Sequence, residues 1–238
     1  MQAFLTLLKF DLGQLARSWL VRIWIVLLLA PAIFLVVVAA SQQERASETL
    51  AAYIAAVLAP LSWLAISVIA AGSIAGEANV IAEAILSKSV KRTEYMAAKI
   101  ASRMGATLAI YFVIMIPFVY LVSHYGANDT SIVGTIVGLI VVATLLAFLA
   151  AYGIAMSVLL RNMQLAAVIV LLTVLISGFA LQFIGLTWMS ATAVINALPQ
   201  TFRGETPLWE QARVFGVFAA LAAGAVSGSM WLFREKDL

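Results

Sequence analysis

EANVIAEAILSKSVKRTEYMAAKIASR, residues 77–103, is the only long charge-dense segment in a chain that otherwise consists of long apolar runs. It contains five of the fourteen Lys and Arg residues, namely Lys88, Lys91, Arg92, Lys99 and Arg103. Beside Glu77 and Glu83, apolar residues recur at helical spacing at Val80, Ile81, Ala84 and Ile85. The sequence therefore predicts a short amphipathic helix, a basic elbow and a second helix that Thr93 caps.

The composition identifies the class of protein around this segment. Of the 238 residues, 64% are hydrophobic and 11% are charged, whereas soluble domains are about half apolar and about a quarter charged. The absence of Cys and the single histidine, His124, exclude disulfides, thiolate metal sites and clusters of histidine ligands. The formal charge of +3 gives little support to nucleic-acid binding. We expect an all-α integral membrane protein.

Six apolar runs are each long enough, or nearly so, to cross about 30 Å of hydrocarbon. They cover residues 23–40, 50–76, 104–123, 132–160, 165–185 and 214–233. We treat residues 1–238 as one transmembrane domain. No charged residue falls inside these six runs, which argues against an ion-coupled transporter because ion relays need buried charges. Some spans contain glycine pairs at the spacing that permits close helix packing, such as Gly134/Gly138 and Gly224/Gly228.

Two further segments are apolar but do not span. Residues 1–18 place Phe4, Leu8, Leu12, Leu15 and Trp19 on one helical stripe, with Lys9, Asp11, Gln14 and Arg17 off it. This pattern predicts an interfacial helix lying flat on the bilayer, or alternatively a cytoplasmic extension of the first span. Residues 186–212 are interrupted by Pro199, Gly204 and Pro207, and predict an outer segment of short, re-entrant helices.

The distribution of Lys and Arg predicts the orientation. Six spans put both termini on one side, and that side carries eleven basic residues against three on the other. The three are Arg45, Arg203 and Arg213. By the positive-inside rule, both termini and residues 77–103 are cytoplasmic, while residues 41–48 and 186–212 lie outside.

The charged segment also carries a family pattern. A glutamate follows a span, then come Ile-Leu-Ser, a basic elbow and an R-x-E-Y-x-x-x-K helix that leads into the next span. The positions are Glu77, Ile85, Leu86, Ser87, Arg92, Glu94, Tyr95 and Lys99. This pattern resembles the cytoplasmic loop of type-2 ATP-binding-cassette (ABC) exporter permeases, and the closing FREKDL, residues 233–238, is similar to that family's C-terminal end.

The resemblance implies a permease subunit, in which residues 77–103 are a cytoplasmic coupling loop whose first helix is the coupling helix. It also implies a second permease, identical or related, and separate ABC ATPase subunits, in the plasma or inner membrane of a prokaryote. The chain has no G-x-x-x-x-G-K-[ST] motif and no catalytic motif. We therefore expect no enzyme activity and no cofactor here, and ATP and Mg²⁺ in the partner subunit.

The resemblance also assigns candidate sites. The docking residues for the ATPase are Glu77, Ile81, Glu83, Ile85, Lys88, Lys91 and Arg92. The alternative for the three cations is contact with anionic lipid headgroups of the membrane. The second and fifth spans offer candidate substrate contacts at Trp63, Ser67, Thr173, Ser177, Phe179 and Gln182, for which ordinary helix packing is the alternative. A non-transporting membrane scaffold or assembly factor is the rival function, followed by a generic channel.

Overall fold

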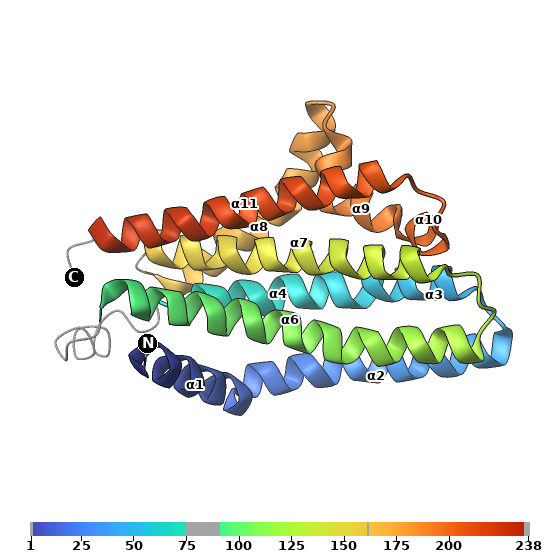
Figure 1. Cartoon of the computed structure of the whole chain (residues 1–238), viewed down its shortest axis with the longest axis horizontal. Helices are drawn as coiled ribbons and strands as arrows, with labels where there is room; N and C mark the ends of the chain where they lie inside the picture. The colour runs from blue at the N-terminus through green and yellow to red at the C-terminus, as the bar shows by residue number, and fades with distance from the viewer. Residues whose placement is uncertain (1, 75–90, 161, 236–238) are drawn as a thin grey trace.

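The computed structural model describes residues 2–74, 91–160 and 162–235. Within these ranges the chain forms helices and no strand, and six helices are long and apolar enough to cross a membrane. They run along one elongated bundle, and the two ends of the chain lie at the same end of it (Figure 1). The expected all-α, multi-span membrane architecture is therefore confirmed.

The helices follow the chain in a simple order. Their bounds are α1 (Gln2–Arg17), α2 (Trp19–Gln42), α3 (Ala46–Tyr53), η1 (Ile54–Leu58), α4 (Ala59–Ala71), α6 (Arg92–Tyr125), α7 (Ile132–Leu159), α8 (Met163–Phe183), η2 (Thr187–Met189), α9 (Ala191–Asn196), α10 (Leu198–Arg203) and α11 (Leu208–Glu235). The second membrane helix comprises α3, η1 and α4 without a break, residues 46–71.

Local sequence explains several helix boundaries. The hydroxyl of Ser131 accepts a hydrogen bond from the backbone N–H of Gly134 and caps α7, and the side chain of Asn162 caps α8 in the same way. Gly204 ends α10 in the left-handed conformation that glycine adopts without strain. The π-helical turn η1 ends at Leu58, two residues before Pro60, which has no N–H for the regular helical ladder.

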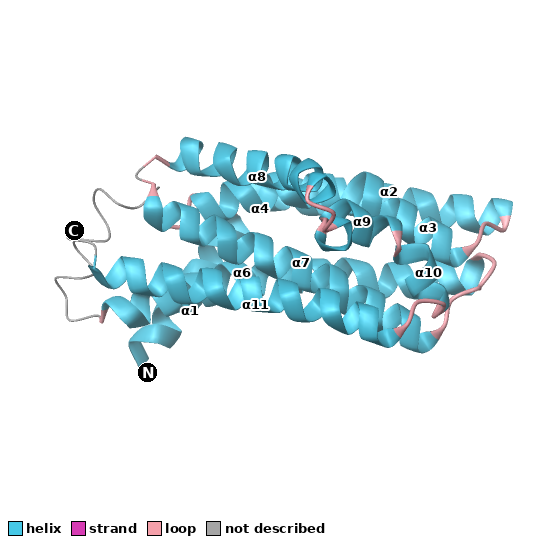
Figure 2. Cartoon of the chain, turned by 90° about the horizontal axis from the view of Figure 1, so that it is seen from above, coloured by secondary structure: helices cyan, strands magenta, loops and turns pink. Residues whose placement is uncertain are grey.

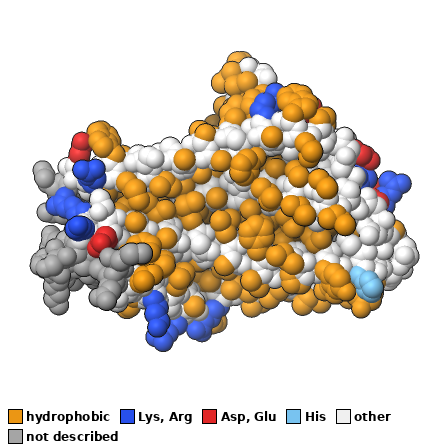
Figure 3. All heavy atoms as spheres, in the orientation of Figure 1, with side chains coloured by type: hydrophobic (Ala, Val, Ile, Leu, Met, Phe, Trp, Pro, Cys, Tyr) orange, Lys and Arg blue, Asp and Glu red, His pale blue; other side chains and the backbone are white. Residues whose placement is uncertain are grey.

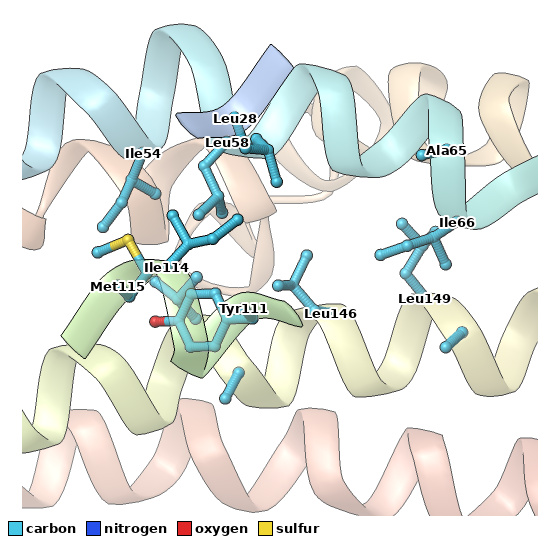
Figure 4. Close-up of a cluster of buried hydrophobic side chains, with 14 of the residues drawn as sticks. Leu28, Ile54, Leu58, Ala65, Ile66, Tyr111, Ile114, Met115, Leu146 and Leu149 are labelled. Carbon is cyan, nitrogen blue, oxygen red and sulfur yellow. The ribbon is translucent and has the colours of Figure 1, made fainter. Parts of the chain in front are cut away.

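Helix α7 lies in the middle of the bundle and packs against α4, α6, α8, α10 and α11. Around it, buried side chains from α2, η1, α4 and α6 form one hydrophobic core that includes Leu58, Ile66, Met115 and Leu146 (Figure 4). The hydroxyl of Tyr111 donates to the carbonyl of Leu139 on α7 at 3.0 Å, so this buried polar group is satisfied.

Two helices begin away from their expected positions. Helix α6 is continuous from Arg92 to Tyr125, so Thr93 lies inside its first turn and is not its N-cap. Helix α11 begins at Leu208, directly after Pro207, so the last membrane helix starts six residues before residue 214. The segment before it contains the short helices η2, α9 and α10.

The end of the bundle away from the termini is held by a polar network. The carboxylate of Asp129, between α6 and α7, accepts hydrogen bonds from the backbone N–H and the hydroxyl of Ser47 at 2.8 and 2.6 Å. Arg203 of α10 donates to the Ser47 hydroxyl and to Glu205, and the hydrogen bond to Glu205 raises the pKa of Arg203. Figure 2 shows the connecting loops gathered at this end.

The surface separates into a hydrophobic middle and charged ends. Hydrophobic side chains cover the long flank of the bundle, and Lys and Arg gather mainly toward its two ends (Figure 3). In the second turn of α11, the guanidinium of Arg213 lies 3.9 Å from the ring centroid of Trp188 and 5.2 Å from that of Trp209. This pattern fits a protein embedded in a membrane.

Candidate functional site

The candidate site is the charged segment predicted to dock an ATPase, together with the helix ends that hold it. Of the proposed docking residues, Lys91 and Arg92 are exposed at the start of α6. The other five lie outside the described residues, namely Glu77, Ile81, Glu83, Ile85 and Lys88. The described structure therefore defines the two flanks of the segment, which are the end of α4 and the first turns of α6.

The first flank is fixed to α7 by one buried hydroxyl. Ser157 of α7 donates to the carbonyl of Ala71 at 2.7 Å and accepts from the backbone N–H of Ile74 at 3.0 Å. The hydroxyl of Ser73 donates to the carbonyl of Ala70 at 2.6 Å. The last backbone groups of α4 have no hydrogen-bond partner within the helix. These contacts supply partners for them and hold residues 71–74 against the core.

The second flank is fixed to the C-terminal helix by stacked aromatic rings. Tyr95 in the first turn of α6 and Phe233 near the end of α11 have ring centroids 5.9 Å apart and ring planes inclined by 20°. Both side chains are buried. The pair joins the start of α6 to the last turns of α11, where the sequence pattern FREKDL begins.

A buried ion pair joins the same flank to α1. The Asp11 carboxylate lies 2.6 Å from the ammonium of Lys99, and the hydroxyl of Ser102 donates to its other oxygen at 2.6 Å. The side chains of Asp11 and Lys99 are only 3% and 7% exposed. The Lys99 ammonium also lies 5.6 Å from the ring centroid of Tyr95. Asp11 is thus part of the interface between α1 and α6.

The sequence places Asp11 off the apolar stripe of an interfacial helix, and the structure adds that its side chain is buried between α1 and α6. An isolated carboxylate on an amphipathic helix is normally solvated, and nothing within residues 1–18 shows its partner. The burial becomes possible because Lys99 and Ser102 lie three residues apart on α6 and both reach Asp11. The sequence contains one sign that this carboxylate has a specific role, since Asp11 is the sole acidic residue before Glu44.

The six candidate pathway residues do not form one surface within the single chain. Ser67 is fully buried, and its hydroxyl donates to the carbonyl of the partly buried Trp63 at 2.6 Å. On α8, Thr173, Phe179 and Gln182 are exposed and Ser177 is half-buried. Thr173 and Gln182 are nine residues apart, which is about half a turn around a helix beyond two full turns. They therefore point to opposite sides of α8.

Within the described part of the chain, no three His, Asp or Glu side chains are grouped so that they could hold a metal ion. Comparisons of the chain with protein-family models, with curated proteins and with solved structures give no match.

Proposed function

We propose that this chain is the transmembrane permease subunit of an ATP-driven ABC transporter, an exporter, and that residues 77–103 dock a separate ATPase subunit. The supporting observation is that a segment with the sequence pattern of such a docking loop is flanked by buried contacts to three different helices. These contacts are Ser157 with Ala71, Tyr95 with Phe233, and Asp11 with Lys99.

This arrangement suits the transmission of force. A segment that transmits a movement of a soluble ATPase to the membrane helices must be firmly attached to packed helices. Its first flank is attached to α7, the central helix of the bundle, and its second to α1 and α11. A displacement of the segment would therefore pass through α4 to α7, and through α6 to α1 and α11.

The other parts of the proposal concern the ATP site, the second permease and the membrane. It has no phosphate-binding P-loop, so ATP and Mg²⁺ would bind the partner subunit. The exposed polar positions of α8 would line a pathway only when a second permease, identical or related, covers them. We place the protein in the plasma or inner membrane of a prokaryote with both termini cytoplasmic, because the side with the termini carries most of the Lys and Arg.

Co-purification tests the proposal. The tagged chain is co-expressed with each ABC ATPase of its source genome and extracted in mild detergent. We expect one ATPase to co-purify in stoichiometric amounts and Ile85→Asp to abolish the complex. Leu208→Asp introduces the same charge at an exposed position of the opposite end and should leave the complex intact. Wild-type chain that retains no ATPase would favour the scaffold function instead.

A further inference from the structure

A large cavity lies beside α1, at the end of the bundle where the termini lie. Its volume is about 1330 Å³, which exceeds the roughly 300–1,000 Å³ of typical small-molecule pockets. The walls come from one side of α1, the start of α2, the end of α4, Arg103 of α6 and Met163 at the start of α8. The cavity is open to the surface, so a large ligand can reach it from the side.

Among the residues that the structure describes, three basic side chains and no acidic side chain line this cavity. Lys9 and Arg17 lie on the exposed side of α1, while Arg103 is only 9% exposed. Asp11, the nearest carboxylate on α1, does not compensate them because its two oxygens already accept hydrogen bonds from Lys99 and Ser102. The described lining of the cavity therefore carries a net positive charge.

Arg103 is the residue that indicates a missing ligand. Its Nε is buried and has no hydrogen-bond partner in the described structure. A buried guanidinium donor without an acceptor is costly, so such a group normally has an acceptor that completes it. A phosphate suits this position, because the planar guanidinium binds it with two parallel hydrogen bonds.

Most of the remaining lining is apolar, which a free phosphate does not need. Besides the cations, the walls include Leu5, Phe10, Leu20, Val68 and Ile69. Leu5 and Phe10 are 57% and 69% exposed although they belong to a helix next to the membrane bundle. A ligand with one anionic headgroup and hydrocarbon chains would satisfy both parts of the cavity.

We propose that this cavity binds an anionic phospholipid, whose headgroup phosphate pairs with Arg103, Lys9 and Arg17 and whose acyl chains cover the apolar walls. Basic pockets between membrane helices on the cytoplasmic side are a general means of recognising acidic headgroups. The bound lipid contacts α1, the end of α4 and α6, so it joins α1 to both helices that flank residues 75–90. The inference does not depend on the proposed transport function.

Native mass spectrometry of the purified full chain in detergent tests the site. Phosphatidylglycerol is titrated in parallel with phosphatidylcholine of the same acyl chains. We expect phosphatidylglycerol to bind at least about tenfold more tightly, and Arg103→Gln to weaken it by about tenfold or more, the loss expected for a charge-assisted hydrogen bond. The matched control is Arg22→Gln, which removes an exposed cation of α2 that does not line the cavity.

Two further variants distinguish lipid binding inside a cavity from lipid binding to a basic surface. They also keep the test valid if the Arg103→Gln protein misfolds. Gly13 lines the cavity, and a Cβ atom at this position meets nothing within 4 Å. Gly13→Trp keeps all three cations but fills the space, so it should block phosphatidylglycerol. The double variant Lys9→Gln/Arg17→Gln changes only exposed side chains and should weaken binding as well.

Each alternative gives a different result. The proposal would be overturned if the wild-type chain bound phosphatidylglycerol and phosphatidylcholine equally. It would also be overturned if the Gly13→Trp protein bound phosphatidylglycerol as tightly as the wild type does. Displacement of phosphatidylglycerol by millimolar inorganic phosphate would show a site for the free anion. A shift from dimer to monomer in the Lys9→Gln/Arg17→Gln spectrum, with lipid binding unchanged, would show that a second copy of the chain covers the cavity.

Discussion

Asp11 and Lys99 are 88 positions apart in the chain, yet their side chains form an ion pair of 2.6 Å that is almost completely buried between α1 and α6. This contact makes the first helix part of the bundle at the end where α4 ends and α6 begins. Contacts of this kind are costly to break, since removal of one partner leaves the other as an uncompensated buried charge.

Asp11→Asn should therefore destabilise the protein by about 3–5 kcal/mol, because Lys99 loses its counter-ion. The double variant Asp11→Leu/Lys99→Met removes both charges and should recover most of that loss. Thermal unfolding in one detergent, monitored by tryptophan fluorescence, measures the stability of both variants. An unfolding temperature of Asp11→Asn equal to that of the wild type would show that the pair contributes nothing.

Ser157→Ala should cost about 1–3 kcal/mol, because the backbone N–H of Ile74 and the carbonyl of Ala71 both lose a buried partner. Ser227→Ala is the matched control, since the exposed Ser227 hydroxyl bonds only within its own helix. The same unfolding assay applies. Equal stability of the two variants would mean that Ser157 does not hold the end of α4.

Gly138→Ala and Gly224→Ala should have opposite effects. A Cβ atom at Gly138 would lie 2.6 Å from the ring of the fully buried Phe202, whereas at Gly224 it meets nothing within 4 Å. Gly138→Ala should therefore lose about 1–3 kcal/mol through overpacking. Gly224→Ala should gain up to about 1 kcal/mol of helix stability. Similar effects at both positions would contradict the close packing of α10 on α7.

Single cysteines test the orientation without interference, because the chain has none of its own. Gln42 and Glu235 are exposed at opposite ends of the bundle. A membrane-impermeant thiol reagent added to intact cells should label Gln42→Cys and leave Glu235→Cys unlabelled until the cells are opened. The reverse pattern would contradict cytoplasmic termini. Ser47 is a poor choice for the label because it is buried and bonded to Asp129.

The sequence predicts well those features that local physics determines. Long uncharged runs locate the six membrane helices, and α7 begins at residue 132, as expected, where Ser131 caps it. The glycine pair Gly134/Gly138 faces α10, but the identical spacing at Gly224/Gly228 faces no close neighbour, because spacing does not specify which helix approaches.

Features that depend on distant partners could not be predicted. The burial of Lys99 has no signal within residues 77–103, because its partner Asp11 lies in another part of the sequence. The same segment gives no sign that Arg103 is buried and lines the cavity beside α1. The burial of Ser157 against the end of α4 likewise has no local signal, since an isolated serine in an apolar helix usually bonds to its own backbone.

The most direct test of the proposed function is the rate of ATP hydrolysis by the co-purified ATPase in proteoliposomes. With the wild-type permease, we predict hydrolysis that differs from that of the ATPase alone, and we predict that Glu77→Ala and Ile85→Asp abolish this difference while membrane insertion is unchanged. Lys91→Gln should have little effect if its cation only contacts lipid headgroups. Normal binding and normal coupled hydrolysis by both the Glu77→Ala and the Ile85→Asp proteins would contradict the assignment of residues 77–103 as the docking segment.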